Sequence, residues 1–156
     1  MELTLARVVH VLAVVLWIGG VAMVTTVLLP AVKRFKDPSE AVAFFEQVEA
    51  RFAWQSRITT LMAGASGFYM LHVLGWQRLL APQYWWIHAM IAVWGVFTLM
   101  LFVFEPLFLH RWFHERATRA PKSTFRMIQR LHWRLLTASL VTVAAAVAGS
   151  HGWFWW

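Results

Sequence analysis

The sequence predicts an all-α integral membrane protein, a four-helix bundle that forms one transmembrane domain over residues 1–156. Its composition is 60% hydrophobic and 13% charged, and a soluble domain of this length could not bury that much apolar surface. Four apolar runs approach the roughly 20 residues that a helix needs to cross a bilayer. Basic residues gather in two of the connections between these runs. The lipid bilayer is therefore the expected environment of most of the chain.

Two features of the composition exclude other classes of protein. The chain has no cysteine, which rules out disulfides, iron–sulfur clusters and thiolate nucleophiles. Its formal net charge is +7, but the basic residues flank apolar runs and do not form a soluble basic face. We therefore expect no nucleic acid among its partners.

The first span is predicted over residues 5–29 and ends before Pro30, because proline lacks the N–H that a continuing helix needs. Its apolar stretch is longer than the core of a secretory signal, and no small-residue cleavage site follows it. We therefore expect a retained span and not a cleaved leader.

The segment Ser39–Arg57 is charged and aromatic, with Val42, Phe45 and Phe52 at helical spacing along one side. Its first residue, a serine, is expected to cap the helix. This pattern is typical of a helix that lies in the membrane interface. It leads directly into a second span, predicted over residues 58–76.

A short connection leads to a third span over residues 84–109, which Pro106 is expected to bend or end. The fourth span is predicted over residues 131–152. The first and third connections hold most of the lysines and arginines, whereas the second holds only Arg78. Because basic loops stay on the cytoplasmic side, both termini are expected on the periplasmic face of a bacterial inner membrane. The terminal tryptophans would there form part of an aromatic belt.

Four of the seven histidines fall near the outward ends of the four predicted spans: His10, His72, His88 and His151. An ionisable residue inside a span is costly and usually faces the bundle interior, so each is a candidate functional residue. A neutral imidazole is an axial ligand of haem iron and also binds copper. Imidazoles that meet at similar depth would hold one haem b, or two, with copper as the alternative cofactor.

Three further residues are candidates for a haem pocket at the depth of these four histidines. Arg7, one turn before His10, and Arg78 are candidate partners of haem propionates, with ordinary interfacial anchoring as the alternative. Gly95 lies about two turns after His88 on the same face, where it leaves room for a flat macrocycle. The alternative for a small residue in a span is close packing of helices.

A weaker group of histidines lies toward the inner side. His110 and His114 have the i, i+4 spacing of a metal clamp and are followed by Glu115, with His132 at the start of the fourth span. Arginines surround this group and oppose a bound cation, so we expect a solvated helix end there.

Three short segments carry a resemblance to known membrane families. They are VVHVLAVVLWIGG around His10, RFAWQSRITTLMAGASG leading into the second span, and YWWIHAMIAVW around His88. This pattern resembles the bacterial copper-resistance protein D (CopD-like) superfamily and its relative, the HemJ-type protoporphyrinogen oxidases. The resemblance implies that His10 and His88 carry function and that a bound haem is of the b type. It also implies a lysine two residues after the third-span histidine of a HemJ-type enzyme, and this chain has Met90 there.

The leading hypothesis is a membrane b-type cytochrome that transfers electrons at the outer face of the inner membrane. Its partner would be a quinone or a periplasmic protein. Two histidines would ligate the iron, His10 with His88 and, for a second haem, His72 with His151. The alternatives are a copper-handling protein that adds methionine ligands, a porphyrinogen-oxidising enzyme, and a structural subunit without a cofactor.

Overall fold

The computed structural model describes residues 1–153, and of Leu109 and His110 it describes only the helical backbone. Within this range the protein is all-helical, with short connections and no strand. Three helical stretches are long and apolar enough to cross a membrane, namely Glu2–Val32, Pro82–Phe108 and Pro121–Ser150. The predicted all-α class is confirmed, and these helices are compatible with a lipid bilayer. The last three residues, which include two of the belt tryptophans, lie outside the described range.

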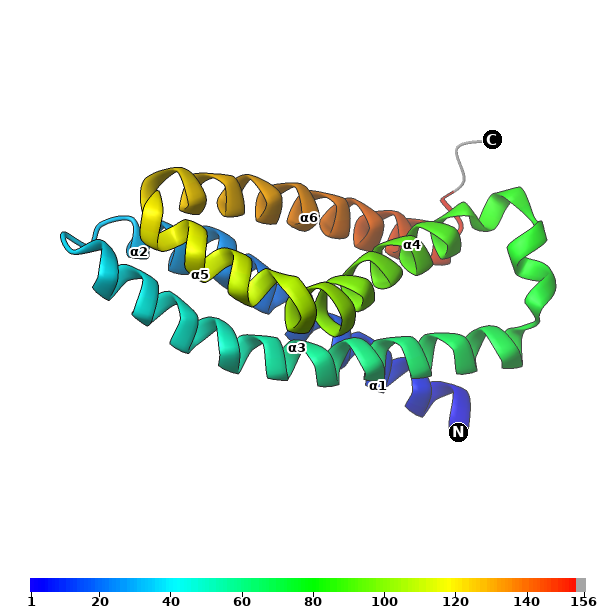
Figure 1. The fold of residues 1–156 in the computed structure, drawn as a ribbon. Coiled ribbons are helices and arrows are strands. Elements are labelled where there is room, and N and C mark those ends of the chain that lie inside the picture. The colour runs from blue at the N-terminus through cyan, green and yellow to red at the C-terminus, as the bar shows by residue number, and fades with distance from the viewer. Residues whose placement is uncertain (154–156) are drawn as a thin grey trace.

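The first helical stretch is longer than predicted and includes a π-helix. α1 (Glu2–Met23) continues through η1 (Val24–Leu28) into α2 (Leu29–Val32), as Figure 1 shows. The prediction that the helix ends before Pro30 is therefore wrong. Pro30 lies in the first turn of α2, directly after the π-helix has interrupted the regular hydrogen-bond pattern. A missing N–H is tolerated at that position.

The predicted interfacial segment and second span form one uninterrupted helix, α3 (Pro38–Leu74). Asp37, and not Ser39, is its N-cap. The Asp37 carboxylate accepts hydrogen bonds from the backbone N–H and the hydroxyl of Ser39, each at 2.8 Å. Pro38 explains the shift, because proline fits the first helical position and leaves the preceding residue as the cap. α3 is not among the three apolar stretches, so a fourth crossing stays a prediction.

The connection after α3 consists of two short 3₁₀ turns, η2 (Trp76–Leu80) and η3 (Pro82–Tyr84). They lead to α4 (Trp85–Leu99), which passes into a second π-helix, η4 (Met100–Leu109). Pro106 lies within η4, and Figure 1 shows that the chain turns a corner there. A proline removes one helical hydrogen bond, which accounts for a bend at this place.

The last two helices are α5 (His110–Arg119) and α6 (Pro121–Ser150). α6 begins ten residues before the predicted fourth span and ends two residues before its predicted end. His151 is the residue that follows the last turn, and Gly152 has a φ of 81°. A glycine adopts this left-handed conformation without strain, so the helix ends here, before Trp153.

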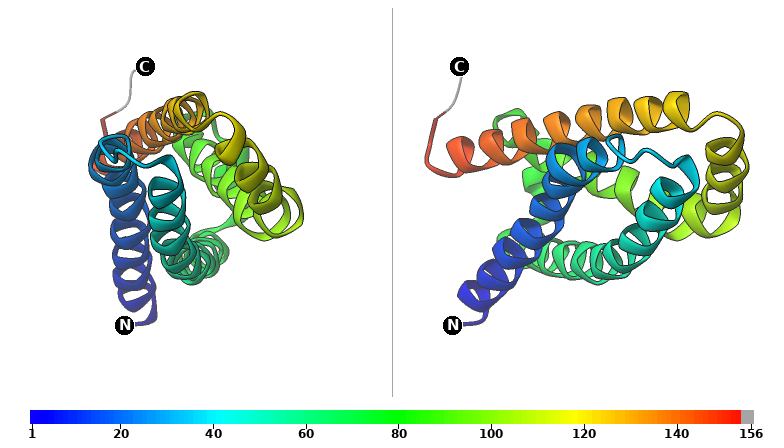
Figure 2. Two further views of the ribbon diagram at one scale, coloured as in Figure 1. Left: turned by 60° about the vertical axis from the view of Figure 1, so that its left-hand side comes forward. Right: turned by 90° about the vertical axis from the view of Figure 1, so that its left-hand side faces the viewer.

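The helices are packed mainly as two pairs, α1 with α3 and α4 with α6 (Figure 2). One buried cluster lies where α2, the start of α3, α5 and the start of α6 meet, and a second lies at the middle of the long helices. The predicted apolar side of Ser39–Arg57 is confirmed, because Val42 and Phe45 are buried in the first cluster and Phe52 packs against both. Apolar side chains such as Val11 and Val15 face outward, as lipid contact requires.

The helix ends that carry the four candidate histidines lie apart from the connections that carry most of the lysines and arginines. In Figure 1 the N terminus, the α3–α4 connection and the end of α6 lie on the right, and we call this the histidine end. The α2–α3 and α5–α6 connections, with their lysines and arginines, lie on the left, and we call this the basic end. Neither buried cluster includes a residue from the last turns at the histidine end.

Candidate functional site

His10 is the best-positioned of the four predicted ligands. Its Nδ1 lies 2.9 Å from the carbonyl oxygen of Ala63 and 3.2 Å from Oγ of Ser66, both on α3. A carbonyl oxygen only accepts, so Nδ1 carries the proton and Nε2 keeps its lone pair. The Ser66 hydroxyl donates to the carbonyl of Met62 at 2.6 Å, which leaves its oxygen free to accept from His10. This is the arrangement that orients metal-binding histidines through their second nitrogen.

A small residue on α3 gives the His10 ring its place. A Cβ on Gly67 would stand 3.2 Å from Cε1 of His10, which is closer than ordinary van der Waals contact. The ring therefore packs directly on the α3 backbone. The sequence predicted an important histidine here, but nothing in the sequence pattern identified its partners on α3.

The other three predicted ligands are exposed on the surface of the described chain. His72 lies in the last turn of α3, His88 lies one turn inside the start of α4, and His151 follows α6. Nδ1 of His151 donates to the carbonyl of Val147 on its own helix at 2.8 Å. All three are at the histidine end, as predicted.

These histidines do not share one depth. His10 contacts α3 between Ala63 and Gly67, so His72 lies five to nine residues nearer the histidine end, or about 8 to 14 Å at the rise of an α-helix. Gly64 packs against Trp94, and His88 lies six residues nearer the histidine end than Trp94, or about 9 Å. His10 is thus deeper in the bundle than the others.

The difference in depth has a direct consequence for metal binding. Among residues 1–153, no group of three or more histidine, aspartate or glutamate side chains is close enough to hold a metal ion. The expected meeting of four imidazoles in one site is therefore not found in this part of the chain. A site with two axial histidines does not depend on such a group.

The remaining predicted pocket residues have different surroundings. Arg78 lies over the ring of Tyr84, 5.0 Å from its centroid, which is a cation–π contact. Arg7 is exposed near the start of α1. A Cβ on Gly95 would meet nothing within 4 Å, so open space borders α4 at this point. Gly95 lies on the side of α4 that carries the exposed residues Ala92 and Leu99, so this space opens to the outside of the helix.

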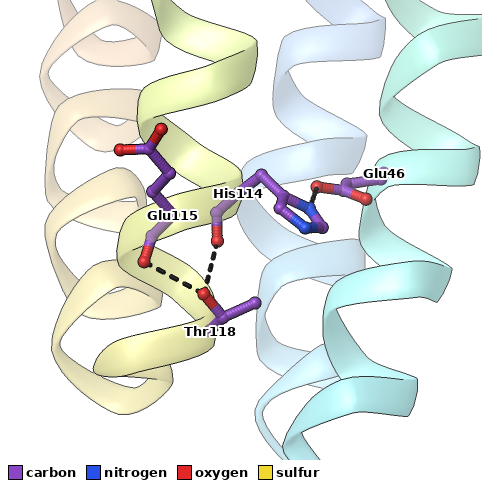
Figure 3. A network of polar contacts seen from close by, with 4 residues as sticks. All are labelled: Glu46, His114, Glu115 and Thr118. Atoms are coloured by element: carbon purple, nitrogen blue, oxygen red, sulfur yellow. Dashed lines mark hydrogen bonds and ion pairs between the residues drawn. The ribbon is translucent and has the colours of Figure 1, made fainter.

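At the basic end, the side chains of His114 and Glu115 point to different sides of α5 (Figure 3). His114 on α5 points toward α3, where its Nδ1 lies 2.9 Å from the Glu46 carboxylate (Figure 3). Glu115 points to another side of α5 in the same view, and the hydroxyl of Thr118 donates to the carbonyls of His114 and Glu115. His114 therefore ties α5 to α3. The side chain of His110 lies outside the described structure.

An ionic contact joins α3 to η4, and it confirms the prediction that Glu105 pairs with an arginine. Arg57 forms an ion pair with Glu105 and also donates from Nε to the carbonyl of Leu101 at 3.2 Å. Both side chains are largely buried, with exposed fractions of 27% and 21%. A charge in this setting needs a partner of opposite sign. The spacing of 48 residues between the two partners explains why no local pattern identified Arg57 as the arginine.

Comparison with known proteins identified no relative of this chain. No protein-family model matches the chain, and no curated protein or solved structure matches it. The function is therefore argued from the residues themselves.

Proposed function

We propose that the protein is a membrane cytochrome that holds a b-type haem in the outer half of a four-helix bundle. His10 and His88 would hold its iron, which requires the His88 side chain to reach inward from a position about 9 Å nearer the histidine end. A bis-histidine haem is low-spin, has no open position on the iron and exchanges single electrons. The proposed function is electron transfer between a lipid-soluble quinone and a partner on the periplasmic side.

The observation that carries this proposal is the hydrogen bond from Nδ1 of His10 to the Ala63 carbonyl. It fixes the ring on another helix and leaves Nε2 as the atom available to iron. The histidines of α6 bond only to their own helix, through the carbonyls of Ile128 and Val147. His10 is therefore held in the way that an axial ligand requires.

One further observation supports the haem over copper. Copper bound by several imidazoles is not favoured, because no group of three acidic or histidine side chains comes together among residues 1–153. We assign no porphyrinogen-oxidase activity, since Met90 stands where the resemblance implies a lysine.

The proposal includes the finer topology. The second half of α3 completes the four crossings, and the N-terminal half of α3 lies in the cytoplasmic interface with its charged side in water. The termini then face the periplasm of a bacterial inner membrane. The support for this is the separation of the basic connections from the histidine end (Figure 1).

The decisive measurement is the absorption spectrum of the detergent-purified protein, oxidised and then reduced with dithionite. We expect a Soret band that shifts on reduction and acid-extractable haem b. The variants His10→Ala and His88→Ala should lose this spectrum.

His114→Ala is the matched control, because this histidine is at the basic end and contacts Glu46. It should retain the full spectrum. A colourless wild-type preparation that keeps copper after dialysis would favour the copper-handling alternative. Retention of the haem spectrum in both His10→Ala and His88→Ala would refute the ligand assignment.

A further inference from the structure

A cavity of about 580 Å³ lies between the middle of the bundle and the basic end. All four long helical stretches and α5 contribute to its walls. Five aromatic side chains, among them Phe45, Phe52 and Phe97, line it together with five charged ones, Glu46, Glu49, Glu105, Arg130 and Arg134. A volume of this size is in the range of pockets that hold small organic ligands.

One polar group in this wall has no partner. Ser56 is 1% exposed, lines the cavity, and its hydroxyl makes no hydrogen bond within the described residues. Other buried serines of the chain satisfy their hydroxyls on their own helix, as Ser139 does on the carbonyl of Leu135 at 2.8 Å. A buried hydroxyl without a partner costs roughly 1 to 3 kcal/mol. A ligand oxygen in the cavity would remove this cost.

A second polar group faces the same space from α6. His132 lines the cavity and is half-buried, and its Nδ1 donates to the carbonyl of Ile128 at 3.0 Å. In this neutral tautomer Nε2 can only accept a hydrogen bond. His132 is therefore able to receive an O–H from a ligand, and when protonated it can donate to a ligand carbonyl.

The backbone around the cavity is irregular on two sides. Val24 of η1 and the residues Met100, Leu101 and Glu105 of η4 line it, so both π-helices of the chain border this space. π-helical turns occur often at functional sites because they widen the helix locally. Glu105, the partner of Arg57 in the ion pair, is one of these lining residues.

We propose that this cavity binds the ring of a lipid-soluble quinone. In its reduced, quinol form the ring faces the aromatic wall, one ring oxygen accepts from the Ser56 hydroxyl, and the opposite O–H donates to Nε2 of His132. A lipid acyl chain would fill the apolar volume but would leave both polar groups without a partner. A flat ring with an oxygen at each end satisfies them from two different helices.

This site is separate from the haem site at His10. The redox use of a bound quinone rests on the proposed function, whereas quinone binding itself does not. Binding should therefore persist in His10→Ala, and a failure of the haem assignment would leave it unchanged.

The test is a titration of the detergent-purified full chain with decylubiquinone kept in its reduced form, with the unfolding temperature as the readout. A ligand that binds only the folded state raises this temperature in a saturable way. We expect Ser56→Ala to weaken the apparent affinity about fivefold, the effect of one lost hydrogen bond. Ser139→Ala, a buried serine outside the cavity, should bind as the wild type does. Ala53→Leu, which places bulk in the cavity wall, should abolish binding while the protein stays monodisperse.

Two results would overturn the proposal. One is an equal rise in unfolding temperature with 1-decanol, which has an alkyl chain of the same length and no ring. The other is wild-type affinity for decylubiquinone in both Ser56→Ala and Ala53→Leu. If the leucine variant aggregates, photolabelling of the wild type with an azidoquinone decides the question, because the label should fall on residues that line the cavity.

Discussion

At the scale of single residues, the function of a polar side chain in this protein depends on whether its own helix satisfies it. Ser66 and Ser139 donate to carbonyls of the turn before them, as serines in membrane helices commonly do. Ser56 does not, and His10 bonds to a different helix from its own. Trp94 likewise bonds to another helix, through the Thr60 carbonyl, and the hydroxyl of Thr60 also has no partner among the described residues. Sequence spacing does not distinguish them from the satisfied residues, because the distinction arises only when helices pack.

The glycine at position 64 gives a test of the packing between α3 and α4. A Cβ there would stand 2.6 Å from the indole of Trp94, whose Nε1 donates to the Thr60 carbonyl at 2.9 Å. Gly64→Ala should force the indole away and lower the free energy of unfolding by about 1 to 3 kcal/mol. Denaturation in mixed micelles measures this change. Gly95→Ala is the control, because a Cβ there meets nothing within 4 Å, and equal stability of the two variants would contradict the contact.

At the scale of elements, helix type and continuity differ most from the sequence prediction. The apolar periodicity correctly placed the helices and the buried side of Ser39–Arg57. It did not reveal that two stretches are π-helical, because a single extra residue per turn leaves the composition unchanged. The predicted cap of α3, Ser39, is also wrong. Pro38 takes the first helical position, which makes Asp37 the cap.

The cap of α3 predicts a pH-dependent stability. The backbone N–H and hydroxyl of Ser39 hold the pKa of Asp37 below its usual value of 3.8. A carboxyl whose pKa is lower in the folded state stabilises the fold above the unfolded value and loses that effect as the pH falls through the folded value. Asp37→Ala should lower the unfolding temperature at pH 7, and its difference from the wild type should shrink as the pH falls below 3.8. Asp37→Asn keeps an acceptor without a titrating charge, so it should stay close to the wild type at pH 7. A constant difference between Asp37→Ala and the wild type across this pH range would argue against the cap.

At the scale of the whole molecule, two packed pairs of helices separate a histidine end from a basic end (Figures 1 and 2). The sequence predicted this separation from charge alone, through Lys33, Arg34, Lys36 and the arginines near α5. It could not predict the relative depth of His10 and His72, because depth depends on how α1 is placed along α3. Nor could it predict the cavity, whose lining comes from segments far apart in the chain.

The proposed topology predicts a labelling pattern that the absence of cysteine makes easy to read. Single cysteines at the exposed positions Thr4, Leu80 and Ser123 should differ in their reaction with a membrane-impermeant maleimide. In intact spheroplasts, Thr4→Cys and Leu80→Cys should react, and Ser123→Cys should react only after lysis. Protection of Leu80→Cys before lysis would mean that the second half of α3 does not cross the membrane.

The π-helix η1 has a consequence for how this protein tolerates changes in length. Each residue advances an α-helix by about 100°, so one residue deleted within α1 would swing the imidazole of His10 away from the α3 backbone. The same deletion between Val24 and Leu28 would only convert a wide turn into a regular one, and the helix faces on either side would keep their orientation. Natural loss of a single residue should therefore be accommodated at this wide turn and selected against only a few residues upstream.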